Sequence, residues 1–455
     1  MLFVTGISPA ISQHVISRSG PVDSAQIRKI YTEVLTNGKG YDWLRDLCFN
    51  VGHRLSGSVG AEKSVVWAKA IMDNLELDRV ILQPVMVPHW ERGAKETARA
   101  SSGKEEFDLS ILALGNSAPT QGVLKAEVIE VASVEELKEL SDKEVKGKIV
   151  FINMPFEKSH IHTFTCYGEN YVARRFGPSE SAKKGAVACL VRSLTHAQDD
   201  DPHTGNTGFD AGVAPIPCAA LGVVSAEKIH KQILAGKKVT VSMQLNCRSF
   251  PDKLSYNVIG EIRGSQKPDE YIIAGGHLDS WDVGHGAHDD GAGCVQSLEM
   301  LRTLKALNYK PKHTIRAVLF MNEENGLRGA TEYATQAKKN NEIHIAAIES
   351  DAGGFTPRGF TFEHNMKAGK ALQAWKPLLE PYLLHRFWEG GTGADIGPLK
   401  ANGPVALFGY RPDDQRYFDY HHAPGDTFDK VNKRELDLGS AAITALVYLI
   451  DNYQW

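Results

Sequence analysis

The pattern of apolar residues predicts an amphipathic helix as the first ordered element. Its apolar face is formed by residues at helical spacing, namely Ile27, Ile30, Tyr31, Val34 and Leu35. Asp23 or Ser24 can cap the start of this helix, and Asn37-Gly38 ends it. A second helix is predicted over residues 61–75, and a strand follows near residues 80–87.

Continuous apolar runs replace this periodicity in the second half of the chain. Four of them are predicted strands, at residues 271–274, 315–321, 343–348 and 405–408. A run that is apolar at successive positions is buried on both faces, which is typical of parallel strands covered by helices. A last helix, over about residues 435–451, is apolar enough to pack on this sheet. The predicted fold class is therefore α/β, with a mostly parallel mixed sheet covered by helices on both faces.

The middle of the chain has a different character. It contains short strands at residues 148–153 and 186–192, a polar stretch at 195–212 and a turn at Pro215-Ile216-Pro217. This pattern indicates a separate small α/β or β-rich module. The expected parts are a poorly ordered segment (1–22), a main domain (23–118 and 248–455) and the insert (119–247).

Length and charge narrow the possible classes of protein. A chain of 455 residues exceeds the usual span of one compact core, so we expect either two domains or one large domain with an insertion. The net charge of -4, without a basic patch among aromatic residues, argues against a nucleic-acid partner. No apolar run reaches the roughly 18 to 20 residues that a membrane span needs. Met1–Ile16 are mildly apolar but lack the basic start of a secretory leader.

The cysteines give no sign of a disulfide framework or a zinc knuckle. They are scattered and include no C-x-x-C pair: Cys48, Cys166, Cys189, Cys218, Cys247 and Cys294. Most lie in apolar surroundings, as Cys189 does in the run AVACLVR. We therefore expect buried free thiols.

Three of the predicted strands end in acidic or imidazole side chains. These endings are His277-Leu278-Asp279, Asn322-Glu323-Glu324 and Glu349-Ser350-Asp351. Sites in open α/β sheets form outside the carboxyl ends of the strands, so we expect these groups to gather at one edge. Two further segments bring similar groups, namely His288-Asp289-Asp290 and His421-His422.

The types of side chain in these segments favour a catalytic metal site. Imidazole and carboxylate ligands without thiolates suit a catalytic zinc ion rather than a structural one. One carboxylate can bridge two ions about 3.5 to 4 Å apart, as in two-metal hydrolases. The sequence has no H-E-x-x-H, G-x-S-x-G, P-loop or G-x-G-x-x-G motif that would favour another chemistry.

Several longer motifs indicate a family more specifically than these single side chains do. They are Val51–Gly57 (VGHRLSG), Val87–Gly93 (VPHWERG), Pro202–Gly205 (PHTG), Gly276–Gly284 (GHLDSWDVG), Glu349–Gly353 (ESDAG), and His421-His422 with Gly425–Thr427. On these motifs the sequence, from about Asp46 to Val447, resembles the aminopeptidase-like family of co-catalytic zinc peptidases. The resemblance implies a zinc exopeptidase-like fold, with an inserted module that resembles a protease-associated domain and covers the site as a lid.

The resemblance also implies two Zn²⁺ ions per chain, held by five ligands. His277 and Asp351 would hold one ion, Glu324 and His422 the other, and Asp289 would bridge both. The family pattern has a histidine four residues before Asp-Thr, and His422 rather than His421 has this spacing from Asp426. We therefore expect His421 to pack against the site or to support a ligand.

Two residues have catalytic roles in the family pattern. Glu323 would be the general base, and Asp279 would orient His277 through its second ring nitrogen. Asp290 would follow the bridging residue across a cis peptide bond. The implied reaction is the hydrolysis of dipeptides and short peptides with free termini by a hydroxide that bridges the two zinc ions.

For some residues two interpretations stay open. His285 and His288 either shape the metal loop or contact the substrate, and Trp281 either anchors that loop or lines the pocket. His203 either reaches the site from the lid or serves a local turn. Asp395 either binds a substrate amine or supports a zinc ligand.

Two other functions are compatible with the same scaffold. One is a non-catalytic binding protein, which the presence of all five ligands and the base argues against. The other is a glutaminyl cyclase-like enzyme, which product analysis would distinguish. The resemblance further implies a homodimer, and a secreted, lysosomal or periplasmic location, although residues 1–16 show no clear signal peptide.

Overall fold

The computed structural model describes residues 20–363 and 365–453. Most of the segment predicted to be poorly ordered, residues 1–19, lies outside this described part. The chain is already helical from Pro21, where α2 (Pro21–Asn37) begins. Proline suits the first turn of a helix because its fixed φ is helical and its missing N–H would have no partner there.

The main domain is built on a mixed sheet of eight strands. In spatial order these are β1 (Arg79–Glu91), β10 (Arg248–Ile262), β12 (His313–Phe320), β11 (Lys267–His277), β13 (Ile343–Glu349), β16 (Ala406–Pro412), β14 (Pro357–Glu363) and β15 (Arg386–Glu389). The four central strands, β12, β11, β13 and β16, are parallel, whereas β1, β10 and β14 pair antiparallel to their inner neighbours. The prediction of a mostly parallel centre in a mixed sheet is confirmed.

Helices cover both faces of this sheet. One face packs against α2, α4 (Val59–Asn74), α10 (Ala292–Ala306), α12 (Met366–Leu379) and α14 (Lys433–Asn452). The other face packs against α11 (Arg328–Lys339) and the short helix at Gly397–Asn402. Ile272 and Ile273 are adjacent in β11 but belong to the cores on opposite faces, and both are fully buried. The predicted helices on both faces are thereby confirmed.

A second sheet of eight strands forms the inserted module. Its order is β3 (Glu105–Leu109), β2 (Thr97–Ser102), β9 (Thr240–Gln244), β5 (Leu124–Val131), β6 (Ile149–Ile152), β7 (Ala188–Arg192), β8 (Cys218–Leu221) and β4 (Ile111–Ala113). Strands β2, β3 and β4 precede residue 119, so the module takes in residues that the sequence assigned to the main domain. Its resemblance to a protease-associated domain stays a prediction.

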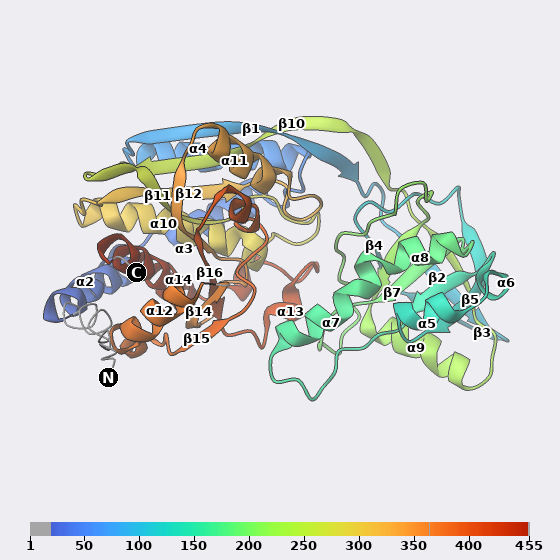
Figure 1. Cartoon of the computed structure of the whole chain (residues 1–455). Helices are drawn as coiled ribbons and strands as arrows, with labels where there is room; N and C mark the ends of the chain where they lie inside the picture. The colour runs from blue at the N-terminus through green and yellow to red at the C-terminus, as the bar shows by residue number, and fades with distance from the viewer. Residues whose placement is uncertain (1–19, 364, 454–455) are drawn as a thin grey trace, which may run out of the picture.

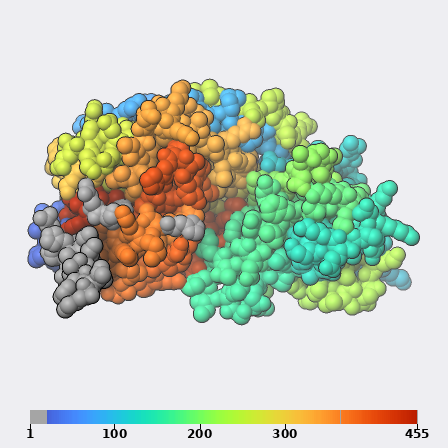
Figure 2. All heavy atoms as spheres, in the orientation of Figure 1, coloured from blue at the N-terminus to red at the C-terminus, as the bar shows by residue number. Residues whose placement is uncertain are grey.

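Five helices accompany the second sheet. They are α5 (Val134–Glu139), α6 (Asp142–Val145), α7 (Thr163–Arg175), α8 (Gly177–Lys183) and α9 (Val223–Leu234). The module lies beside the main domain, and the long strands β1 and β10 run toward it (Figure 1). The space-filling view shows the two parts in contact (Figure 2). Within this contact the Thr163 hydroxyl donates to the carbonyl of Asp414 at 2.6 Å.

Two other expectations concern covalent links and membranes. All six cysteines are free and buried, as their apolar surroundings predicted. Among the described residues, no helix is both long and apolar enough to cross a membrane.

Candidate metal centre

The carboxyl ends of three neighbouring strands deliver the predicted side chains to one place. His277 is the last residue of β11, which lies between β12 and β13. Glu324 follows the end of β12, and Asp351 follows the end of β13. Because the three strands are parallel, their carboxyl ends share one edge of the sheet.

Asp289 lies at the centre of the group, between two histidines. His277 Nε2 is 3.1 Å from Asp289 Oδ1 and 3.6 Å from Asp351 Oδ1. His422 Nε2 is 3.2 Å from Asp289 Oδ2 and 3.1 Å from Glu324 Oε2. Each oxygen of Asp289 therefore faces a different histidine–carboxylate pair.

A tight loop presents Asp289. The loop follows Gly286, whose backbone has a left-handed helical conformation. It contains a cis peptide bond between Asp289 and Asp290, as the family pattern implied. The Asp426 carboxylate accepts the backbone N–H of His288 at 2.8 Å and that of Asp289 at 3.1 Å. The Asp290 carboxylate accepts the N–H of His277 at 3.0 Å, so two buried acids fix the loop and the strand end.

This geometry suits metal ions. Three groups of potential ligand atoms each lie within 4.8 Å of one another: Asp289, His421 and His422; His277, Asp290 and Asp351; and His277, Asp289 and Glu324. Asp289 Oδ2 is buried and has no hydrogen-bond donor, as expected of an oxygen meant for a cation. Asp290 is a poorer ligand, because its two oxygens already accept the N–H groups of His277 and Gly293.

The adjacent histidines differ in their access to Asp289. Their rings stack with centroids 3.5 Å apart. His421 Nε2 lies 3.7 Å from Asp289 Oδ2, compared with 3.2 Å for His422, and only His422 also contacts Glu324. The geometry favours His422 as the ligand.

The acidic groups strongly perturb one another. Burial raises the pKa of Glu324 to about 7, and the charge of Asp289 adds to the shift. Burial also raises the pKa of Glu323 well above its usual range, with further contributions from Asp351 and Glu324. Burial would raise the pKa of Asp289 too, but the adjacent imidazoles of His277 and His422 outweigh it and hold that pKa well below its usual range. Carboxylates gathered in this way are stabilised by a bound cation.

Asp279 contacts the site differently from the expectation. Nδ1 of His277 lies 3.0 Å from the backbone carbonyl oxygen of Asp279, and 3.8 Å from its carboxylate. The carboxylate instead accepts the backbone N–H groups of Asn322, Glu323 and Glu324, at 2.8, 3.1 and 3.3 Å. The side chain of Asp279 therefore fixes the glutamate turn, while its main chain fixes the histidine.

The inserted module supports the His421-His422 turn. Thr204 donates its N–H to the carbonyl of His422 at 2.9 Å, and its own carbonyl lies 3.2 Å from His422 Nδ1. His203 Nδ1 lies 2.7 Å from the carbonyl of His421. His422 has a φ of 61°, a conformation that a non-glycine residue keeps only when its surroundings hold it. His203 thus reaches the site from the insert, and the PHTG motif was the signal for this contact.

Three other residues with open interpretations, His288, Trp281 and Asp395, can now be placed. His288 is buried, stacks on Phe355 and accepts the Gly354 N–H at 3.1 Å, which is a loop role. Trp281 is buried and its ring lies 5.7 Å from that of His422. Asp395 is buried and neither of its oxygens has a hydrogen-bond partner.

A cavity of about 620 Å³ opens onto the metal centre between the two parts of the molecule. From the main domain it is lined by Asp289, Glu323, Glu324, Asn325, Gly326, Leu327, Asp351, Tyr417, Phe418, His421 and His422. From the other side it is lined by Asn116, Phe164, Tyr167, Tyr171, Arg174, Arg175, Asn206, Thr207 and Gly208. Its volume falls in the range of small-ligand sites.

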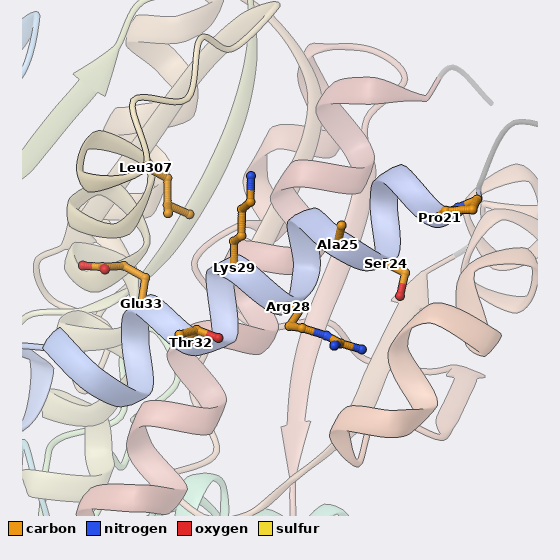
Figure 3. Close-up of a pocket in the computed structure, with 8 residues that line it drawn as sticks. All are labelled: Pro21, Ser24, Ala25, Arg28, Lys29, Thr32, Glu33 and Leu307. Atoms are coloured by element: carbon orange, nitrogen blue, oxygen red, sulfur yellow. The ribbon is translucent and has the colours of Figure 1, made fainter.

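Another cavity, of about 680 Å³, lies on the outside of α2 (Figure 3). Its described lining consists of Pro21, Ser24, Ala25, Arg28, Lys29, Thr32, Glu33 and Leu307. Glu33 is the one carboxylate of this lining, and it pairs with Arg302 at 2.8 Å. Arg28 and Lys29 leave the helix in different directions (Figure 3). This surface gathers no catalytic groups.

Known proteins share both the sequence and the fold. Residues 257–447 match the model of Peptidase family M28. Carboxypeptidase Q of Xenopus laevis is 37% identical over 93% of this chain and 89% of its own length. Human carboxypeptidase Q is 35% identical over 90% of this chain and 85% of its own length.

Solved structures agree with this relationship. A Peptidase M28 precursor from Shewanella amazonensis is 33% identical, with a TM-score of 0.90, over 95% of this chain and 98% of that one. The zinc aminopeptidase of Bacillus subtilis has a TM-score of 0.64 at 21% identity, over 90% of this chain and 94% of that one, and shows the shared fold. The fold and the ligand cluster define a metallo-exopeptidase. The chain belongs to the carboxypeptidase Q family, within Peptidase family M28.

Proposed function

We propose that this protein is a dizinc exopeptidase that hydrolyses dipeptides and short peptides with free termini. The observation that carries the proposal is the position of Asp289, whose two oxygens face two separate histidine–carboxylate pairs. His277 and Asp351 would hold one zinc ion, Glu324 and His422 the other, and Asp289 both. When bound, the two ions lower the pKa of a shared water and polarise the peptide carbonyl.

Glu323 is the proposed general base. It lines the cavity beside the ligands Glu324 and Asp351 but belongs to none of the three ligand groups. Its backbone N–H is held by Asp279 at 3.1 Å, which keeps the residue in its turn. Glu323 would accept the proton of the attacking water and then pass it to the nitrogen of the leaving amine.

The shape of the cavity supports the preference for short peptides. The insert forms the wall opposite the metal ligands, so the site is bounded on two sides. The insert would limit the length of the peptide that enters the cavity. A preference for peptides with a free carboxyl terminus also fits the name of the carboxypeptidase Q relatives.

The test is a panel of dipeptides assayed before and after removal of metal by a chelator, with zinc measured in parallel. Release of free amino acids that stops on chelation and returns with zinc supports the proposal. A protein that binds dipeptides without cleaving them would be a non-catalytic binding protein. Cyclisation of amino-terminal glutamine without cleavage would identify a glutaminyl cyclase-like enzyme.

The homodimer expected from the resemblance is also a proposal. Met86 of β1 and Leu254 of β10 are paired across the sheet edge, and each is about half exposed. Val59 and Val66 of α4 are exposed as well. These apolar side chains supply surface that a second copy could cover, and sedimentation of the purified protein would show one or two chains.

A further inference from the structure

The insert side of the cavity carries hydrogen-bond donors that lack acceptors. Arg174 and Arg175 end helix α7, and both line the cavity together with Thr207. Arg174 Nε and the Thr207 hydroxyl are buried and have no hydrogen-bond partner. Because leaving buried polar groups unpaired is costly, this arrangement points to a ligand that supplies acceptors.

The two arginines also have no carboxylate in direct contact, although Lys183 and, less strongly, the charge of Arg175 lower the pKa of Asp210. Within the described part of the chain, neither guanidinium forms an ion pair with a carboxylate. Arg174 is 5% exposed, and it donates to the carbonyl of Thr204 at 3.0 Å and to the hydroxyl of Tyr167 at 2.7 Å. Arg175 is partly exposed and lies over the Phe176 ring, 5.4 Å from its centroid. A buried arginine without an acidic partner is unusual, and it favours an anionic ligand.

These donors are close to the metal centre. Arg174 Nη1 lies 3.3 Å from Nδ1 of His422, and the opposite ring nitrogen, Nε2, faces Glu324 and Asp289. The guanidinium is therefore separated from the metal-facing atoms by about one imidazole ring. The cavity has an acidic wall where the metal ligands lie and a basic wall where the insert lies.

We propose that Arg174 and Arg175, with the Thr207 hydroxyl, bind the free α-carboxylate of the residue that follows the scissile bond. This inference rests on the proposed peptidase function. In a dipeptide, three bonds separate the scissile carbonyl carbon from the carboxylate carbon. The short distance between the metal centre and the guanidinium groups suits that spacing. Arginine is well suited to this role because its planar fork matches the geometry of a carboxylate.

The site would therefore select peptides with one residue after the scissile bond and a free carboxyl terminus. Blocking that terminus as an amide removes the negative charge, and a longer peptide carries the charge away from the arginines. The insert would thus act on substrate choice as well as covering the metal centre.

The experiment compares kcat/KM for a dipeptide and for its carboxyl-terminal amide. We expect Arg175→Gln to lower kcat/KM for the free acid by about 10- to 100-fold, and to affect the amide much less, because only the acid offers a charged acceptor. Arg175→Lys should lose less than Arg175→Gln, because it keeps the charge without the fork. Thr207→Val, which nearly preserves the shape, should show a smaller loss of the same kind. Zinc content should not change in any of them.

Arg263→Gln is the matched control. Arg263 is exposed and follows β10, whose last residue pairs with Ile315 near the start of β12, at the edge of the sheet away from the metal ligands. It should leave both substrates unaffected. Cleavage of neither peptide by the zinc-loaded wild-type protein would overturn the proposed function and the carboxylate site with it. Cleavage of the dipeptide, with Arg175→Gln affecting acid and amide equally or not at all, would overturn the carboxylate site alone.

Discussion

The two walls of the cavity are built in different ways. The main-domain wall brings imidazole and carboxylate side chains together at the ends of neighbouring parallel strands, with His277 and Asp351 as examples. The insert wall contributes the guanidinium groups of Arg174 and Arg175, and Arg174 Nε has no hydrogen-bond partner; behind this wall, Thr204 holds the His422 turn through its main-chain atoms. The first wall depends on the topology of one sheet, and the second depends on how two modules dock. We infer that the main-domain wall performs the chemistry. The insert wall would hold the proposed metal ligand His422 in place and select the substrate.

The largest expected effect lies in the main-domain wall. Glu323→Gln keeps the size of the side chain but removes the base, so kcat should fall by about 10²- to 10⁴-fold with little change in KM. Zinc content should remain at the wild-type value, because Glu323 is not one of the proposed ligands. Steady-state kinetics on a dipeptide, together with elemental analysis, would measure both quantities. Full activity, or a loss of zinc, would show that Glu323 has another role.

Glu324→Gln is the matched variant at the neighbouring position. It removes a proposed ligand, so it should weaken one metal site and lower the zinc content of the purified protein. Added zinc should restore part of the activity, which it should not do for Glu323→Gln. If the two variants behaved alike, the division of roles between the adjacent glutamates would be wrong.

A smaller effect is expected from the insert wall. His203→Ala removes the side chain that contacts the carbonyl of His421, 2.7 Å away, and so loosens the turn that presents His422. Changes to groups that support a metal ligand commonly cost about 10- to 100-fold in metal affinity or activity. Zinc affinity can be measured by competition with a chelator.

His230→Ala is the control for this prediction, because His230 lies on α9 of the same module and pairs with Glu130 of β5. It should leave zinc affinity unchanged. If His203→Ala did the same, the insert would cover the metal centre without supporting it.

A reducing agent should not change the thermal stability of either part of the molecule. All six cysteines are free and buried, so there is no disulfide to break. The thermal midpoint measured by differential scanning calorimetry should be the same with and without a reductant. A lower midpoint in the reductant would reveal a disulfide that the described structure does not contain.

Much of the main domain could be predicted because its strands are continuous apolar runs. The runs at residues 315–321 and 343–348 correspond to β12 and β13, and the acidic residues after them lie at the site. The limits of the insert were harder to predict. Strand β2 (TARASS) has little apolar alternation, and it pairs with β9 from far along the chain, which local patterns do not reveal.

The same difference applies to the site. The five proposed ligands came from motifs that resemble a family pattern, and four of them lie at a strand end or in the loop that begins α10. The contacts of Asp279 were not predicted, because a sequence does not show whether the backbone carbonyl or the carboxylate of this residue faces His277. Arg174 was missed because its importance comes only from the docking of α7 against the His422 turn.

The central claim is a two-zinc centre bridged by Asp289, and the most direct test is the zinc content of Asp289→Asn and the wild-type protein, both purified without chelator. The account predicts about two zinc ions per wild-type chain. The variant should lose zinc from both sites, since Asp289 faces both histidine–carboxylate pairs. Dipeptide hydrolysis should be lost with the metal. A wild-type protein that is active without zinc, or an Asp289→Asn variant that retains the wild-type zinc content, would contradict the account.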